Sequence, residues 1–187
     1  MSKIRMPVFS LNNENIKVVN EYLYLGHILS DNMSDDSDIL RQRKKLFAQG
    51  NNLRRKFYMC SLEVKLTLFK SYCASLYTAQ LWTRYTKTAM NKLYIAYHYM
   101  LKLLVGVAKW EHTRPICVDL NIPYCPALIR NIIYKFMGRL IKSSNDYIKA
   151  ICDMSIYFTS HIWRHWRSLL YVNGVGYWCM NVFIFLM

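Results

Sequence analysis

Apolar residues recur with a helical period along most of the chain, and they define the elements that the sequence predicts. The first helix is expected from about residue 34 to residue 58. Ser34, Asp35 and Asp36 precede its apolar run, and such residues cap free amide groups and suit the positive end of a helix. One face collects the apolar residues, which are Ile39, Leu46, Gly50, Leu53 and Phe57. That stripe predicts an amphipathic helix packed against a core.

Three more helices are expected downstream, over about 61–82, 88–105 and 126–140. Gly106 follows the third helix and Pro126 opens the fourth, which are positions where these residue types are common. The apolar stripes are Leu62, Leu66, Phe69, Cys73, Leu76 and Tyr77 in the second helix, Met90, Leu93, Tyr94, Tyr97, Met100, Leu101 and Leu104 in the third, and Leu128, Ile132, Phe136 and Leu140 in the fourth. Thr78 is expected to lie away from the stripe of its helix. Successive amphipathic helices with short connections predict a small bundle.

The first 33 residues are expected to be extended rather than helical. Asn12 and Asn13 form a turn signal between two apolar stretches. The run 22–29 is rich in aromatic and aliphatic residues, which suits a buried strand. Gly26 within it predicts a bend or a close approach of the backbone to another group. The N-terminus is therefore predicted to form a short β-hairpin.

The predicted fold is mainly α, a short N-terminal β-hairpin followed by a helical bundle. The expected segments are the hairpin at 1–33, the bundle at 34–106, a C-terminal helical segment at 107–170 and an apolar tail at 171–187. Prolines make the start of the third segment, up to about residue 127, irregular. The apolar part of the tail is shorter than the ~20 residues of a spanning helix, so a membrane anchor is the least favoured interpretation.

The composition of the chain indicates a polyanionic partner. Lys and Arg number 25 against 11 Asp and Glu, which gives a formal net charge of +14, while 53% of the residues are hydrophobic and can form a core. Nucleic acid is the first candidate and an anionic membrane surface the second, with a basic protein lacking a specific partner as the alternative. Met1–Ser10 has no secretory signal, so an intracellular location is expected, with nucleus and cytoplasm left open. The six cysteines are widely spaced and are interpreted as small buried hydrophobes.

The positive charge is concentrated on the first predicted helix. Opposite its apolar stripe lie Arg41, Lys44, Lys45, Arg55 and Lys56. A surface without a charged partner would mix acidic and basic residues to gain pair energy, whereas this face is nearly all of one sign. It predicts contact with nucleic acid, and the alternative is an ordinary solvated face.

Possible metal ligands are present but incomplete. Two neighbouring aspartates, Asp35 and Asp36, could hold Mg²⁺ as paired carboxylates do in polymerases, but helix capping explains them better. His161 and His165 lie one helical turn apart and lack a third ligand. His112, Cys117 and Cys125 lack the paired cysteine spacing of a zinc site. No metal or cofactor is predicted, and no Gly-rich phosphate loop or nucleophile elbow occurs.

The run from Tyr22 to Asp31 reads YLYLGHILSD and resembles the YLG segment of LINE-type non-LTR retrotransposon reverse transcriptases. The sequence that follows is similar to the helical thumb of that family, through 39–57, 64–73 and the pair Leu81 and Trp82. Residues 1–6 resemble the stretch just after the catalytic strand. Residues 128–140 and 163–170 are similar, more weakly, to the C-terminal end.

The resemblance implies a palm-end hairpin remnant followed by a thumb-like bundle that holds a primer–template duplex. Tyr24, Leu25, Gly26 and His27 would then lie near the primer end. The five cations of the first helix would contact RNA or DNA phosphates without reading sequence.

The resemblance also implies that this chain lacks catalytic residues. The family's aromatic-x-Asp-Asp motif and its partner aspartate would precede residue 1, so no polymerisation is expected, and Mg²⁺ belongs only to the intact family enzyme. Loss of the palm would expose the strand at 22–29. The alternatives are a domesticated helical module that binds a protein, and a basic protein on a membrane surface.

Overall fold

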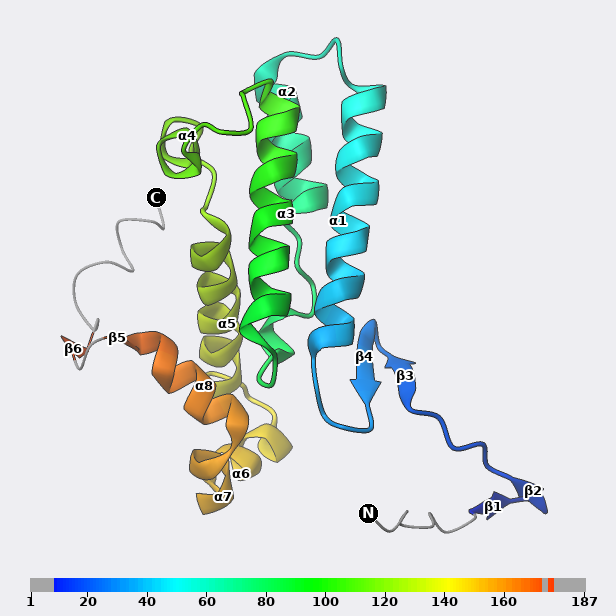
Figure 1. Ribbon diagram of the computed structural model, residues 1–187. Coiled ribbons are helices and arrows are strands. Elements are labelled where there is room, and N and C mark those ends of the chain that lie inside the picture. Colours follow the sequence, from blue (N-terminus) through cyan, green and yellow to red (C-terminus); the bar gives the residue numbers. More distant parts are fainter. Residues whose placement is uncertain (1–8, 173–174, 177–187) are drawn as a thin grey trace.

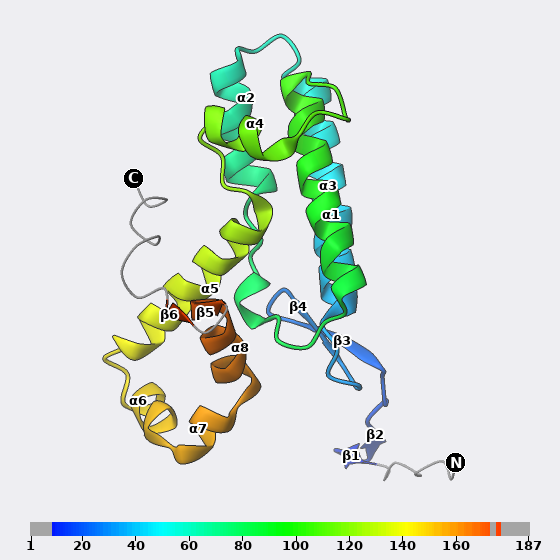
Figure 2. The same ribbon diagram turned by 60° about the vertical axis from the view of Figure 1, so that its left-hand side comes forward.

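Helices form most of the molecule, as the sequence predicts. The computed structural model describes residues 9–172 and 175–176. In Figure 1 the long helices α5, α3 and α1 stand in a row, with α2 behind α3. Figure 2 shows that α5 diverges from α3 at an angle. The helices are α1 (Asp36–Lys56), α2 (Leu62–Leu68), α3 (Lys87–Val105), α4 (Thr113–Asp119), α5 (Cys125–Ile141), α6 (Asp146–Asp153), α7 (Ser155–Thr159) and α8 (His161–Leu170). The mainly α fold with short N-terminal hairpins is confirmed.

Two β-hairpins precede the bundle. The first pairs β1 (Ser10–Leu11) with β2 (Glu14–Asn15), and the second pairs β3 (Glu21–Tyr24) with β4 (His27–Ser30). Both turn through two residues with positive φ, 51° and 65° at Asn12 and Asn13 and 46° and 82° at Leu25 and Gly26. Two such residues in sequence make the tight turn that suits the twist of a hairpin. The predictions of a turn at 12–13 and a bend at Gly26 are confirmed.

One hydrophobic core joins α1, α3, α5 and the turns between α2 and α3. Its largest fully buried side chains include Trp82, Tyr97, Phe69, Leu46 and Met137. The rings of Phe69 and Tyr97 meet edge to face, with their centroids 5.2 Å apart. Because helices from both halves of the chain contribute to this core, their positions depend on one another.

Helices α1 and α3 pack closely because Gly50 faces α3. A Cβ at Gly50 would collide with the terminal methyl group of Met100. The predicted apolar stripe of α1 is confirmed, with Ile39, Leu46 and Leu53 at most 6% exposed. The α3 stripe is also buried except for Tyr94, which is partly buried, and Gly106 ends α3 with a φ of 83°, as expected for a C-terminal glycine.

The helix predicted over 61–82 is wrong beyond residue 68. After α2 the chain forms a π-helical turn (η1, Phe69–Cys73) and then a 3-10 turn (η2, Ala79–Leu81). This break reverses two predicted orientations. Thr78 is buried at 1% exposure, and Tyr77 is exposed at 68%. The buried hydroxyl of Thr78 donates to a carboxylate of α1, which a continuous amphipathic pattern could not predict.

The strand predicted at 22–29 is wrong in its burial. It is the hairpin β3–β4, and all four residues of β3 are exposed. The region 107–127, predicted to be irregular, contains α4, in which Pro115 lies in the first turn where proline is tolerated. In α5 the buried residues are Cys125, Ile129, Ile133 and Met137 rather than the predicted stripe, which is only partly buried at the edge of the core.

The C-terminal part folds back along α5. Helix α8 contacts α5, and the backbone then forms an antiparallel pair of β5 (Tyr171–Val172) and β6 (Val175–Gly176). The rest of the apolar tail predicted at 171–187 lies outside the described residues. In the described ranges, no helix is both long and apolar enough to cross a bilayer.

Candidate nucleic-acid interface

A buried carboxylate joins the second hairpin to α1 and η2. The side chain of Asp38 is 0% exposed. Its Oδ2 accepts hydrogen bonds from the Thr78 hydroxyl at 2.6 Å and from Trp82 Nε1 at 2.8 Å. Its Oδ1 accepts from Arg41 Nη2 at 2.9 Å and from the backbone N–H of Ile28 at 3.2 Å. One side chain therefore fixes three elements that lie far apart in the sequence.

These donors keep Asp38 ionised. Burial by itself would raise the pKa of this carboxyl, but its hydrogen bonds, led by those from Thr78 and Trp82, outweigh that cost and lower the pKa below the ordinary value. The charged Arg41 contributes in the same direction. Asp38 is therefore a negative structural centre at neutral pH.

His27 is placed between two carboxylates. Its Nδ1 lies 3.2 Å from Asp38 Oδ2, and its Nε2 lies 3.4 Å from Asp35 Oδ1. The residue is only 9% exposed. His27 was predicted to lie near a primer end, but in this position it holds the hairpin on α1 and presents little surface to a ligand.

The acidic residues at the start of α1 hold the loop that leads into α3. Asp35 Oδ2 accepts from the backbone N–H groups of Thr83 and Arg84, each at 2.8 Å. Asp36 Oδ1 accepts from the backbone N–H of Thr86 at 2.8 Å. The predicted side-chain cap by Asp35 is not formed, since its carboxylate reaches across to this loop instead. These oxygens are already occupied by protein donors.

The tip of the second hairpin is the exposed part of the predicted primer-end group. Tyr24 is 56% exposed and Leu25 is 78% exposed. The carbonyl oxygen of Gly26 accepts from Arg41 Nη2, which ties the tip to α1. Gly26 itself lies against the ring of Tyr77, since a Cβ there would be 3.6 Å from that ring. The hairpin therefore presents aromatic and aliphatic side chains beside the basic helix.

Tyr77 is a candidate that sequence reasoning placed in the core. The residue is 68% exposed, and its ring lies against Gly26 at the hairpin tip. The helical period over 61–82 does not predict that Tyr77 is exposed, because its exposure follows from the break in the helix after η1.

Four of the five predicted cations share the open face of α1. Lys44, Lys45, Arg55 and Lys56 are all exposed, whereas the stripe through Leu46 faces the core. Along the helix axis, Lys44 and Arg55 are separated by about 16 Å. Among the residues that the structure describes, none of these four has a carboxylate within ion-pairing distance. The face therefore carries uncompensated positive charge.

Arg41 has a different place from the other four. Its side chain is 35% exposed, and its guanidinium is directed to Asp38 and to the carbonyl of Gly26. It thus neutralises the buried carboxylate and positions the hairpin. A nucleic-acid contact at this residue would use only the part of the guanidinium that remains in water.

The other titratable candidates are separated or belong to the core. His161 contacts Arg84, and His165 lies edge-on to Tyr85, so the two histidines serve different neighbours. No group of three or more His, Cys, Asp or Glu side chains that could hold a metal ion occurs in the described part of the chain. His98 stacks on Tyr124 at 4.3 Å, and burial, helped by the Lys102 cation, lowers its pKa to about 4.

The prediction that the cysteines are small buried hydrophobes is confirmed only in part. Cys73, Cys117 and Cys125 are buried, whereas Cys60 and Cys152 are partly exposed, and all five are free thiols. Burial raises the pKa of the Cys73 thiol to about 11, so it is neutral and unreactive at pH 7.

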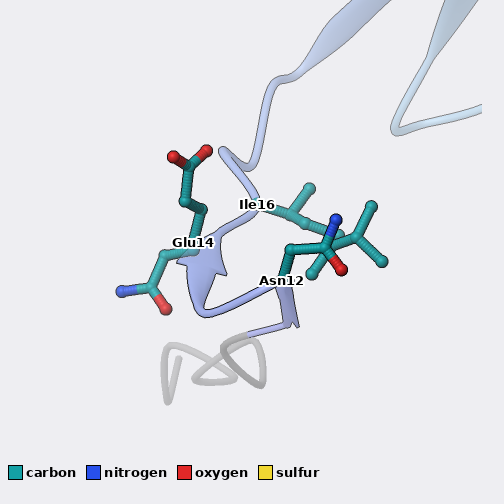
Figure 3. Close-up of a pocket in the computed structure, with 5 residues that line it drawn as sticks. Asn12, Glu14 and Ile16 are labelled. Atoms are coloured by element: carbon teal, nitrogen blue, oxygen red, sulfur yellow. The ribbon is translucent and has the colours of Figure 1, made fainter.

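The N-terminal hairpin has a hollow that brings no chemistry together. It measures about 400 Å³ and is lined by Leu11, Asn12, Glu14, Asn15 and Ile16. Figure 3 shows the side chains of Asn12 and Glu14 pointing in different directions. All of these residues are exposed, on a hairpin that extends away from the bundle (Figure 1). The hollow therefore lacks the converging polar groups of a ligand site.

Comparison with known proteins gives one informative similarity. No protein-family model and no solved structure matches the chain. The chain is 25% identical over 150 residues, 78% of its length, to the RNA-directed DNA polymerase from the mobile element jockey of Drosophila funebris. It spans only 16% of the length of that polymerase. The chain is therefore similar to a segment of a mobile-element polymerase, in agreement with the reverse-transcriptase resemblance noted over most of residues 2–145.

Proposed function

We propose that this chain is the nucleic-acid-holding part of a non-LTR reverse transcriptase, the end of the palm and the thumb, and that it binds RNA or DNA duplexes without sequence selectivity. The binding surface is the open face of α1, with Lys44, Lys45, Arg55 and Lys56. The single observation that carries the proposal is this row of exposed, unpaired cations on one helix face. The similarity to a mobile-element polymerase supports a nucleic acid as the polyanion.

The second hairpin adds a local contact to this surface. Its tip is held beside α1 by Arg41 and Asp38, and the exposed residues Tyr24 and Tyr77 lie at this tip. Aromatic faces stack on unpaired bases with little sequence preference. The cations would bind phosphates while the rings contact the end of a strand.

The proposal includes no chemistry by this chain alone. Asp35, Asp36 and Asp38 are the closely spaced carboxylates of the described chain, and backbone or side-chain donors occupy each of them. Two-metal phosphoryl transfer needs carboxylates that are open to Mg²⁺. Purified chain with Mg²⁺, primed RNA and deoxynucleotides should therefore incorporate no nucleotide. Reproducible, template-dependent extension would contradict the proposal.

Charge reversal tests the binding face directly. The variant Lys44→Glu, Lys45→Glu, Arg55→Glu and Lys56→Glu should lower the affinity for a primer–template duplex by at least about tenfold at moderate salt, because several phosphate contacts become repulsive. Fluorescence anisotropy measures the affinity, and circular dichroism checks that the helices persist.

A matched control separates the face from the net charge. Lys70, Lys87, Lys92 and Lys109 are also exposed and lie outside α1, and their reversal to Glu changes the net charge by the same amount. This control should lose much less affinity. Equal losses in the two variants would mean that only overall charge matters, and undiminished binding by the α1 variant would reject the assigned face.

The proposal also concerns where in the organism the chain acts. The chain would work inside the cell, where RNA and DNA templates are found and where its free thiols remain reduced. A protein partner is the competing explanation, and it predicts binding that survives high salt and depends on the exposed aromatic residues.

A further inference from the structure

Helix α5 carries a second set of cations that the sequence interpretation did not single out. Arg130, Lys135 and Arg139 on this helix, and Lys142 directly after it, are all exposed. Between Asp119 and Asp146 the chain has no acidic residue at all. A solvated helix face without a charged partner would mix in acids to form stabilising pairs. The excess of basic over acidic residues seen on α1 therefore recurs on α5.

Three of these cations surround one open hollow. Lys135, Gly138, Arg139 and Lys142 line a space of about 460 Å³. A Cβ at Gly138 would have no atom within 4 Å, so the floor of the hollow is free of neighbouring side chains. No ion pair links these cations to a carboxylate in the part of the chain that the structure describes. The hollow is accessible and positively charged.

The spacing of the three cations fits a chain of phosphates. Lys135, Arg139 and Lys142 follow one another at i, i+4 and i+7 and span about 10 Å of helix axis. The negative end of the helix dipole favours cations in the last turn, which accounts for Arg139 and Lys142. Lys135 lies two turns before the end of α5, so the dipole does not account for it.

This second cationic surface cannot be an extension of the α1 face. Helices α1 and α5 flank α3 on different sides (Figures 1 and 2). The buried stripe of each, through Leu46 in α1 and Ile133 in α5, faces the shared core. Their exposed cations therefore point away from the core in different directions, with the bundle between them.

We propose that the α5 hollow is a second phosphate-backbone site, so that one chain binds two nucleic-acid segments at once, one on α1 and one on α5. This inference rests on the proposed function of the α1 face and adds to it the capacity to bridge two strands or duplexes.

A bridging assay with the full chain tests the proposal. One DNA duplex is fixed to beads, and a second, fluorescent duplex is captured only if the protein binds both. The unmodified chain should capture the second duplex at low salt. The variant Lys135→Gln, Arg139→Gln and Lys142→Gln should reduce capture by about tenfold, while binding to a single duplex in solution persists through α1.

Gly138 offers a matched pair within the hollow. Gly138→Glu places a carboxylate among the three cations and should also reduce capture, whereas Gly138→Ala fits the open space and should capture as well as the unmodified chain. Circular dichroism confirms that each variant is folded. Equal capture by the Glu and Ala variants would overturn the α5 site.

The outcomes separate this inference from the function of α1. If only the α1 reversal abolishes capture and the α5 variants capture normally, the α5 site is rejected while the α1 face stands. If the α5 variants lose all duplex binding and the α1 reversal loses none, the α1 face and the two-site bridge are both rejected. Loss of capture in both variants, with each variant still binding a single duplex through its intact site, supports the bridge.

Discussion

At the residue scale, Asp38 determines where the hairpin lies. It is fully buried and accepts hydrogen bonds from Thr78, Trp82 and the backbone of Ile28, and it pairs with Arg41. A buried charge is tolerated only when such partners replace its lost hydration. Through Arg41 and Gly26, the same network sets the place of the exposed hairpin tip beside the basic helix.

Removal of the charge at Asp38 should destabilise the fold. In Asp38→Asn the amide group brings an N–H toward the donors of Thr78 and Trp82 and leaves Arg41 uncompensated, so a loss on the order of 3 kcal/mol in unfolding free energy is expected at pH 7. Urea denaturation measures this loss. A difference below about 1 kcal/mol would contradict the structural role of the carboxylate.

The effect of Asp38→Asn should also depend on pH. The folded-state pKa of Asp38 is lowered, so its contribution to stability is complete above the unfolded pKa of about 4 and is lost as the pH falls through the folded value. The difference between the unmodified chain and Asp38→Asn should therefore narrow below about pH 4. A difference that stays constant down to the acid transition would show that Asp38 is not ionised in the folded state.

At the element scale, the sequence predicts α1 and α3 well and the segment between them poorly. Both helices have a continuous apolar stripe, and Gly106 ends α3 as its position suggests. The helical spacing of apolar residues over 61–82 predicts one continuous helix, because this pattern reports only which residues are apolar. It cannot reveal that Thr78 and Trp82 turn inward to reach a carboxylate on α1, and so it misses both the break and the exposure of Tyr77.

The contact of α1 with α3 should be sensitive to side-chain volume at Gly50. Gly50→Val adds atoms where the Met100 side chain lies and should lower the unfolding free energy by about 1–3 kcal/mol. Because the obstruction comes from one side chain, Met100→Ala in the same chain should recover part of the loss. Thermal melts of the two single variants and the double variant measure the coupling, and strictly additive losses would contradict the packing.

At the scale of the whole molecule, exposed positive charge is concentrated on the faces of α1 and α5. The α1 cations could be predicted from sequence because a helical period assigns them to one side, and four of them lie on an open face. The sequence does not predict the α5 cations as a group, because they are spaced widely along a mostly apolar helix. The inward placement of His27 and Arg41 could not be predicted, since it depends on a hairpin and a helix meeting in space.

The salt dependence of duplex binding tests the function of the α1 face most directly. Each phosphate neutralised by a cation contributes roughly 0.9 to the slope of log affinity against log salt for duplex DNA. Replacement of Lys44, Lys45, Arg55 and Lys56 by Gln should therefore reduce that slope by roughly 3 to 4, with the fold intact by circular dichroism. A slope that equals that of the unmodified chain would mean that these four side chains do not touch the phosphate backbone.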